Sequence, residues 1–172
     1  PIELEGTCPL PEAQLDRFLF KLEVSTPSVD AMVRILAETT GASNEPETTC
    51  LAATDLLQLQ RVVREVLCGT HLLRFVAEIV AQTHPRTADA SERTRRFVRY
   101  GASARAGQAM ILGAKARALL AGRAAVTRED IDVCLLPALR HRVLLSYEAE
   151  ATEVTVADLL GEWRSTADRR FK

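Results

Sequence analysis

Arg105 occupies the position in this 172-residue chain that best suits phosphate chemistry. Ser103 has the side chain of a helix N-cap, and the alanine- and leucine-rich residues after it predict a long helix with Arg105 in its first turn. Because the helix macrodipole is positive at this end, an arginine there costs up to about 1 kcal/mol unless an anion meets it. A guanidinium binds phosphate oxygens through paired hydrogen bonds, so Arg105 is a candidate phosphate ligand. The alternative is an exposed arginine whose stem turns into solvent.

The other residues that could bind a metal or a ligand form no comparable pattern. The four cysteines contain no C-x-x-C pair and the three histidines are far apart, so no metal or redox site is expected. A basic cluster with aromatic side chains comprises Arg93, Arg95, Arg96, Phe97, Arg99 and Tyr100. Such a cluster can bind nucleic acid. The acidic residues Asp89 and Glu92 dilute its charge and favour a solvated or intersubunit surface instead.

Hydrophobic periodicity and capping residues predict a mainly α-helical chain with one strand. Helices are expected over residues 11–18, 28–40, 56–66, 72–84, 103–122, 127–137 and 155–163. Alternating apolar residues predict a strand over residues 20–24, and residues 41–54 have the composition of an exposed connection. Pro137 is expected to kink or end its helix, and residues 165–172 are expected to form a flexible basic tail. Neither an apolar run of membrane-spanning length nor a signal peptide is visible.

Three segments resemble, in the family's order, the MoxR family of AAA+ ATPases. They are PIELEGT and PLPEAQLDRF at residues 1–7 and 9–18, GASARA at residues 101–106, and VTRED with LRHRVLLS at residues 126–130 and 139–146. The resemblance implies the end of an α/β ATPase core over residues 1–27 and a helical-bundle lid domain over residues 28–164. A phosphate-binding loop of the G-x-x-x-x-G-K-[ST] type is absent from the sequence. We therefore expect a C-terminal piece of a longer ATPase that does not hydrolyse ATP alone.

Two arginines match the family's functional positions. The resemblance implies that Arg105 is the sensor 2 residue, which reaches the γ-phosphate of ATP bound in the same subunit. It implies that Arg17 is the arginine finger, which enters a neighbouring subunit's pocket and stabilises charge on the transferred phosphoryl group. A salt bridge from Arg17 to Asp16 or Glu12 is the alternative. Ala104 stands where the family usually has proline, which leaves the first helical turn less rigid.

The resemblance also implies partners and cofactors. It implies a cytoplasmic, chaperone-like machine that uses ATP and Mg²⁺, forms a ring of identical subunits, normally a hexamer, and acts on proteins that often carry von Willebrand A domains. Residues 1–60 carry three basic and ten acidic side chains, whereas the remainder carries nineteen and thirteen, an asymmetry that suits head-to-tail packing. Nucleic acid is not expected as a partner. The alternatives are a magnesium chelatase motor subunit, a replicative helicase, or a non-enzymatic helical adaptor.

Overall fold

The structure, a computed structural model, describes residues 10–41 and 51–170, which are mainly α-helical as predicted. The helices are α1 (Glu12–Leu15), α2 (Val29–Thr40), α3 (Ala53–Glu65), α4 (Thr70–Gln82), α5 (Glu92–Phe97), α6 (Ala104–Leu120), α7 (Arg128–Leu139), α8 (Tyr147–Ala151) and α9 (Val156–Arg169). The strands are β1 (Val98–Tyr100) and β2 (Leu144–Leu145). Most of the connection expected over residues 41–54 lies outside the described residues. The chain divides into a small unit, residues 22–61, and a larger unit formed by the remaining residues.

The small unit contains α2 and most of α3. Helix α2 begins as predicted at Ser28, whose hydroxyl accepts a hydrogen bond from the Ala31 N–H at 3.2 Å. Although α2 is amphipathic, none of its residues is buried. Its apolar stripe therefore contributes no buried core to the chain.

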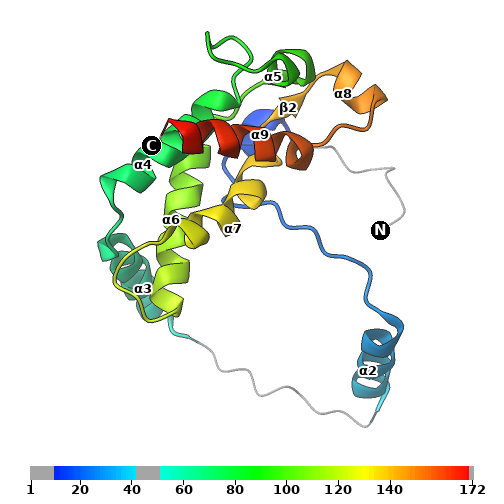
Figure 1. The fold of residues 1–172 in the computed structure, drawn as a ribbon. Coiled ribbons are helices and arrows are strands. Elements are labelled where there is room, and N and C mark those ends of the chain that lie inside the picture. Colours follow the sequence, from blue (N-terminus) through cyan, green and yellow to red (C-terminus); the bar gives the residue numbers. More distant parts are fainter. Residues whose placement is uncertain (1–9, 42–50, 171–172) are drawn as a thin grey trace. The chain divides into compact units, whose positions relative to one another are not determined.

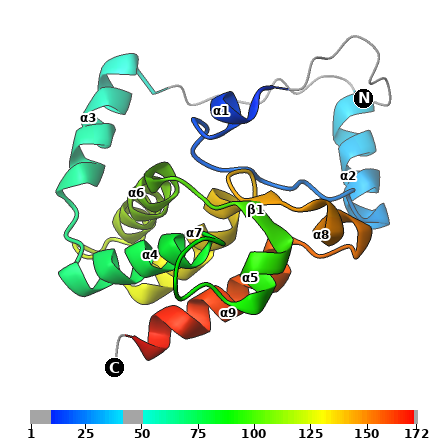
Figure 2. The ribbon, with the colours of Figure 1, turned by 90° about the horizontal axis from the view of Figure 1, so that it is seen from above.

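The core of the larger unit surrounds α6, the helix predicted to be central. Six of its alanine, methionine and glycine residues are buried, and α6 packs most extensively against α7 and also against α4 (Figure 2). Small side chains allow this close helix packing. Helix α9 lies against α4 and α7 (Figure 1). Its buried Trp163 donates a hydrogen bond to Thr94 Oγ1 at 2.8 Å. Rigid packing of α6 fixes the position of its N-terminal turn.

The β structure differs from the prediction. Strands β1 and β2 form a short antiparallel ladder that pairs Val98 with Leu145, and the sequence analysis did not predict it. The strand predicted over residues 20–24 is wrong, because these residues have no regular secondary structure. The Lys21 N–H donates instead to the carbonyl oxygen of Pro137 at 2.9 Å. The Lys21 N–H therefore bonds to a helix. A strand needs a partner strand, and the alternation of apolar and polar residues over 20–24 did not supply one.

The C-terminal helix is longer than predicted. The prediction of a flexible tail from residue 165 is wrong for the described residues, because α9 continues to Arg169 and Ala167 is fully buried. Arg170 makes ion pairs with Glu78 at 3.0 Å and Asp89 at 2.7 Å. The predicted capping boxes at the starts of α7 and α9 are both present. Among the described residues, the helices are too short or too polar to cross a membrane.

Pro137 lies inside α7 and does not end the helix at its own position. The helix includes Pro137 and ends two residues later at Leu139. Shortly after the end of the helix, His141 and Arg142 are buried against the turn that follows α1. The end of α7 thus brings two basic side chains to a segment more than a hundred residues away in the sequence.

Candidate functional site

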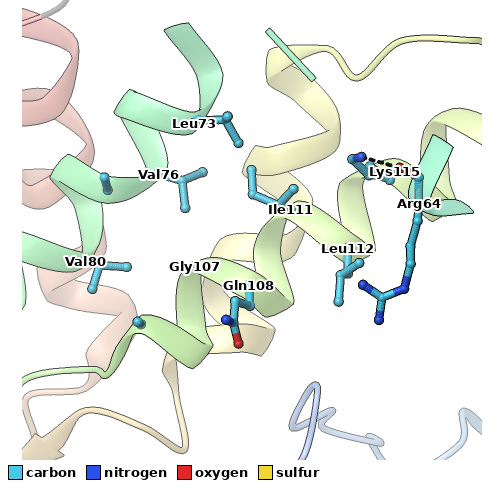
Figure 3. A pocket seen from close by; sticks show the side chains of 11 residues that line it. Arg64, Leu73, Val76, Val80, Gly107, Gln108, Ile111, Leu112 and Lys115 are labelled. Carbon is cyan, nitrogen blue, oxygen red and sulfur yellow. Dashed lines mark hydrogen bonds between the residues drawn. The ribbon is translucent and has the colours of Figure 1, made fainter. Parts of the chain in front are cut away.

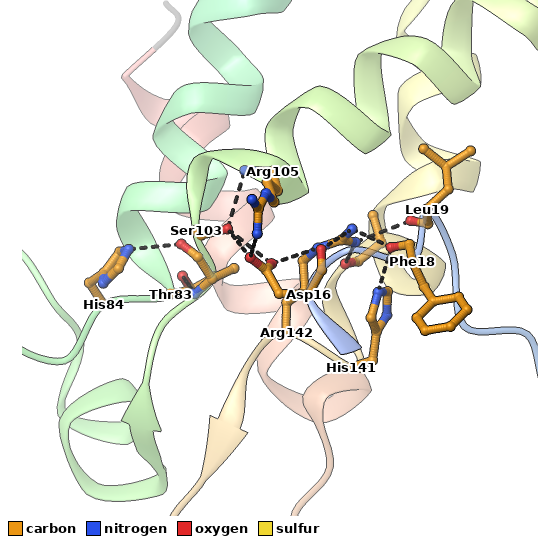
Figure 4. A network of polar contacts seen from close by, with 11 residues as sticks. Asp16, Phe18, Leu19, Thr83, His84, Ser103, Arg105, His141 and Arg142 are labelled. Carbon is orange, nitrogen blue, oxygen red and sulfur yellow. Dashed lines mark hydrogen bonds and ion pairs between the residues drawn. The ribbon is translucent and has the colours of Figure 1, made fainter. Parts of the chain in front are cut away.

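The N-terminus of α6 has the predicted geometry. Ser103 is the N-cap, and its hydroxyl accepts a hydrogen bond from the Arg105 N–H at 3.2 Å. The Arg105 side chain lies in the first turn, is 52% exposed, and donates through Nη1 to Asp16 Oδ2 at 3.2 Å (Figure 4). The anion that the sequence led us to expect at this cation is therefore present in the chain as a carboxylate.

Two arginines and one serine hydroxyl donate hydrogen bonds to the carboxylate of Asp16. Its carboxylate accepts hydrogen bonds from the Ser103 hydroxyl, at 3.0 Å to either oxygen, and from Arg142 Nε at 3.1 Å, in addition to Arg105. Burial alone would raise the pKa of Asp16, but the hydrogen bonds from Ser103, Arg105 and Arg142 together hold this pKa below its ordinary value. Asp16 is therefore a carboxylate at neutral pH.

Arg142 holds the turn that follows α1. Its side chain is only 2% exposed and donates to the carbonyl oxygens of Asp16, Phe18 and Leu19, as well as to Ala138 one turn earlier. His141 Nε2 lies 3.1 Å from the same Phe18 carbonyl oxygen. Burial lowers the pKa of Arg142 even though Asp16 lies beside it. The backbone around Arg17 is consequently fixed by side chains from the end of α7.

Arg17 projects from this held turn. It lies at the protein surface, and its side chain makes no ion pair within residues 10–41 and 51–170. The salt bridge to Asp16 or Glu12, considered as an alternative, is not formed, since Asp16 pairs with Arg105 and Arg142. Arg17, Arg105 and Arg142 line one depression of about 240 Å³. Two guanidiniums, those of Arg105 and Arg142, thus bind one carboxylate, and the exposed Arg17 lines the same depression.

The segment leading into α6 is fixed by α4 and the residues after it. The Ala102 N–H donates to Thr83 Oγ1 and its carbonyl oxygen lies near His84 Nε2, each at 2.9 Å (Figure 4). A Cβ at Gly101 would come within 2.7 Å of the His84 ring and 2.8 Å of the Thr83 carbonyl oxygen, so this crossing requires glycine. These contacts fix the position of Ser103 and hence of Arg105.

A largely apolar groove of about 750 Å³ runs between α4 and α6 (Figure 3). Val76 and Val80 of α4 face Ile111 of α6 across it. At one end, Lys115 Nζ donates to the Arg64 carbonyl oxygen at 2.7 Å. The groove shares Gln108 and Leu112 with the depression at Arg105, so the two are continuous along α6.

The basic cluster at residues 93–100 lies on α5 and β1, and part of it is paired. Arg96 makes an ion pair with Glu148 of α8, and Arg95 donates to the Ala88 carbonyl oxygen at 2.8 Å. The guanidinium of Arg99 lies over the ring of Tyr100, 5.3 Å from its centroid. Acidic and histidine or cysteine side chains nowhere gather into a possible metal site in the described ranges.

Comparison with known proteins agrees with this architecture. Residues 90–163 match the family model described as the AAA lid domain. The chain is 36% identical over 155 residues to Chaperone MoxR1 of Mycobacterium tuberculosis, covering 90% of this chain and 41% of that protein. It is 37% identical over 153 residues to the uncharacterised protein YeaC of Bacillus subtilis (87% and 44%) and 31% identical over 162 residues to Protein MoxR of Paracoccus denitrificans (84% and 46%).

A solved structure has the same fold. It is the crystal structure of a candidate ATPase from Cytophaga hutchinsonii, 29% identical in sequence, with a TM-score of 0.83 over 95% of this chain and 50% of that one. The chain thus spans less than half the length of the curated relatives it matches. With its lid-domain match and these relatives, the chain belongs to the MoxR family of AAA+ ATPases.

Proposed function

We propose that this chain is the lid-bearing part of a MoxR-type ATPase that couples ATP hydrolysis to the remodelling or maturation of partner proteins. The observation that carries the proposal is the depression lined by three arginines, Arg17, Arg105 and Arg142, and by a single carboxylate, that of Asp16. A surplus of positive charge at a helix N-terminus suits a polyanion such as the triphosphate of ATP. Two of the relatives carry MoxR in their names, and one of them is called a chaperone.

In this proposal Arg105 is the sensor 2 residue that contacts the γ-phosphate. The fit is supported by the carboxylate of Asp16, an anion already seated on the Arg105 guanidinium at 3.2 Å. Because about half of the Arg105 side chain is exposed, a phosphate oxygen can reach it without unfolding the turn. Loss of the γ-phosphate would remove this contact and release the lid.

Arg17 is proposed as the arginine finger. Arg142 and His141 hold the backbone of its turn, while its own exposed side chain lines the depression. A fixed backbone with an exposed guanidinium is suited to stabilising charge on a transferred phosphoryl group. Since Arg17 and Arg105 line the same depression, we assign both to one nucleotide, that of the neighbouring subunit, instead of to two separate pockets.

Such an arrangement requires a ring of identical subunits, for which we propose a hexamer. Mg²⁺ would accompany ATP and neutralise its phosphates, and the remaining ligands would come from the longer protein. We propose soluble client proteins, including proteins with von Willebrand A domains, and a cytoplasmic location.

Steady-state ATP hydrolysis by the longer protein tests the proposal. Arg17→Ala and Arg105→Ala should each reduce turnover strongly, by about 10³-fold or more for the finger, because charge on the transferred group loses its stabilisation. Arg86→Ala, at an exposed arginine outside the depression, is the matched control and should leave turnover unchanged.

Mixing subunits separates the two arginines' sites of action. Each variant is mixed with subunits that retain both arginines but cannot hydrolyse ATP. Recovery of turnover in both mixtures would support action on the neighbour's nucleotide. Recovery for Arg17→Ala alone would return Arg105 to its own subunit's nucleotide. Unchanged turnover in both single variants would refute the proposal and favour a helical adaptor.

A further inference from the structure

Asp16 occupies the place at the N-terminus of α6 where a phosphate would bind. Its Oδ2 accepts the hydrogen bond from Arg105 Nη1, and the Ser103 hydroxyl that caps α6 lies 3.0 Å from both carboxylate oxygens. A carboxylate and a phosphate compete for the same donors, because both bind a guanidinium through anionic oxygens. The chain therefore contains an internal competitor for the proposed ligand of Arg105.

The contacts of Asp16 differ in strength. The pair with Arg142 joins the carboxylate to a side chain that is 2% exposed and also bound to three carbonyl oxygens of the same turn. The pair with Arg105 is a single contact at 3.2 Å to a side chain that is 52% exposed. The two ion pairs are similar in length, since Arg142 Nε lies 3.1 Å from Asp16 Oδ1, so they differ in burial and in the number of other contacts that hold each arginine. Arg105 is consequently the partner that can leave, while Ser103 and Arg142 keep Asp16 in place.

We propose that Asp16 is a positioning residue that holds Arg105 in the absence of nucleotide and gives it up to the γ-phosphate. The proposal rests on the assignment of Arg105 as the sensor 2 residue. Asp16 keeps the guanidinium at the depression that Arg17 also lines while no phosphate is bound. It also lowers the affinity for ATP, since the phosphate must replace an existing ion pair.

The expected size of this effect follows from the exposure of the pair. An ion pair between exposed side chains changes an equilibrium constant by up to about fivefold. Removing the carboxylate should therefore tighten binding of a nucleoside triphosphate by about two- to fivefold. Binding of ADP should not change, because ADP lacks the phosphate that Arg105 contacts.

The test measures equilibrium binding of ATPγS and of ADP to the longer protein, under the conditions in which turnover is measured. Asp16→Asn removes the charge with little change in size, and Asp16→Ser provides a second variant without the carboxylate. Glu148→Gln, which removes the charge from the exposed pair with Arg96, is the matched control and should have no effect. Fluorescence of Trp163, the single tryptophan of the 172-residue chain, reports in that chain whether each variant is folded.

The expected result is tighter ATPγS binding by the Asp16 variants, unchanged ADP binding, and loss of the gain when Arg105→Ala is combined with Asp16→Asn. Equal or weaker ATPγS binding by the Asp16 variants, or an equal gain for ADP, would overturn the role of Asp16. If Arg105→Ala still weakens ATPγS binding in that case, the sensor assignment stands. An Arg105→Ala variant with normal ATPγS binding and turnover would remove both proposals.

Discussion

Replacing Arg142 with methionine should loosen the turn that carries Arg17 and lower the stability of the larger unit. Arg142 donates to four backbone carbonyl oxygens and to the carboxylate of Asp16. Hydrogen bonds of a charged group contribute about 1.5–3 kcal/mol each when taken singly. Their sum overstates the effect, because burying the guanidinium itself costs several kcal/mol and methionine avoids that cost.

Two further features of the site reduce the loss. Asp16 is 22% exposed and retains Ser103 and Arg105, so it does not become an unpaired buried charge. The carbonyl oxygens of the turn can also reach water once the turn moves. We therefore expect Arg142→Met to lower the free energy of unfolding by about 2 kcal/mol, well below the 3–5 kcal/mol or so of a fully buried broken pair. For a chain of this length the melting temperature should fall by about 4–8 °C.

Two measurements on the 172-residue chain check this expectation. Urea unfolding followed by Trp163 fluorescence gives the change in stability, because this side chain is 1% exposed in the core. Hydrogen exchange of the Lys21 amide, which donates to Pro137, reports whether the segment remains docked and should become faster. Arg86→Met is the control at an exposed position. A stability change below about 0.5 kcal/mol with unchanged Lys21 exchange would refute the view that Arg142 holds the turn.

Two other predictions concern the core around α6. Gly113→Ala should destabilise the chain by about 1–3 kcal/mol in urea unfolding, because the added Cβ would meet the Phe20 ring and lie 2.9 Å from Cys134 Sγ. Gly161→Ala, which meets nothing within 4 Å, should instead stabilise α9 by up to about 1 kcal/mol, so destabilisation of equal size in both variants would contradict the packing argument. Paired hydrogen bonds from Arg123 lower the pKa of Asp130 from 3.8 to about 2, so the carboxylate should contribute about 2 kcal/mol of stability that is present above pH 4 and lost as the pH falls toward 2. An Asp130→Asn variant with the same acid sensitivity between pH 4 and pH 2 as the unaltered chain would show that this carboxylate is not responsible.

Local sequence signals predicted the framework of the site. Ser28, Ser103, Thr127 and Thr155 each stand at the start of a helix as expected, because N-cap side chains satisfy N–H groups within the next three residues. The same reasoning placed Arg105 in the first turn of α6. Such signals act over a few residues and can be read without knowledge of the tertiary fold.

The partners of Arg105 could not be predicted in this way. Asp16 and Arg105 are 89 positions apart, and Asp16 and Arg142 are 126 positions apart. From the sequence alone, Asp16 is a candidate partner only of Arg17, its neighbour in the chain. Arg142 lay within a segment that resembles the family, but nothing local indicated that this arginine is buried. Pairings over such distances depend on how α1, α6 and α7 pack.

Two of the errors of secondary structure have related causes. Residues 20–24 alternate like a strand, yet a strand requires a neighbour, and the Lys21 N–H finds its acceptor at the end of α7. Residues 165–170 are basic and polar enough to suggest a tail, yet Ala167 packs in the core and Arg170 pairs with two carboxylates. In both cases tertiary contacts outweighed the local pattern.

The position of Arg105, unfavourable when the helix is considered alone, becomes reasonable once Asp16 is taken into account. A cation in the first turn of α6 raises the energy of the helix unless an anion lies beside it, and Asp16 provides that anion. Asp16 is in turn kept there by Arg142, whose hydrogen bonds to the carbonyl oxygens of residues 16, 18 and 19 leave the side chain of Arg17 pointing outward. Because one buried arginine fixes both the carboxylate and the turn, a rearrangement of the Arg105 side chain that separates it from Asp16 need not disturb Arg17. The structure therefore separates an arginine that can exchange partners from one whose backbone is held, as the proposed roles of sensor and finger require.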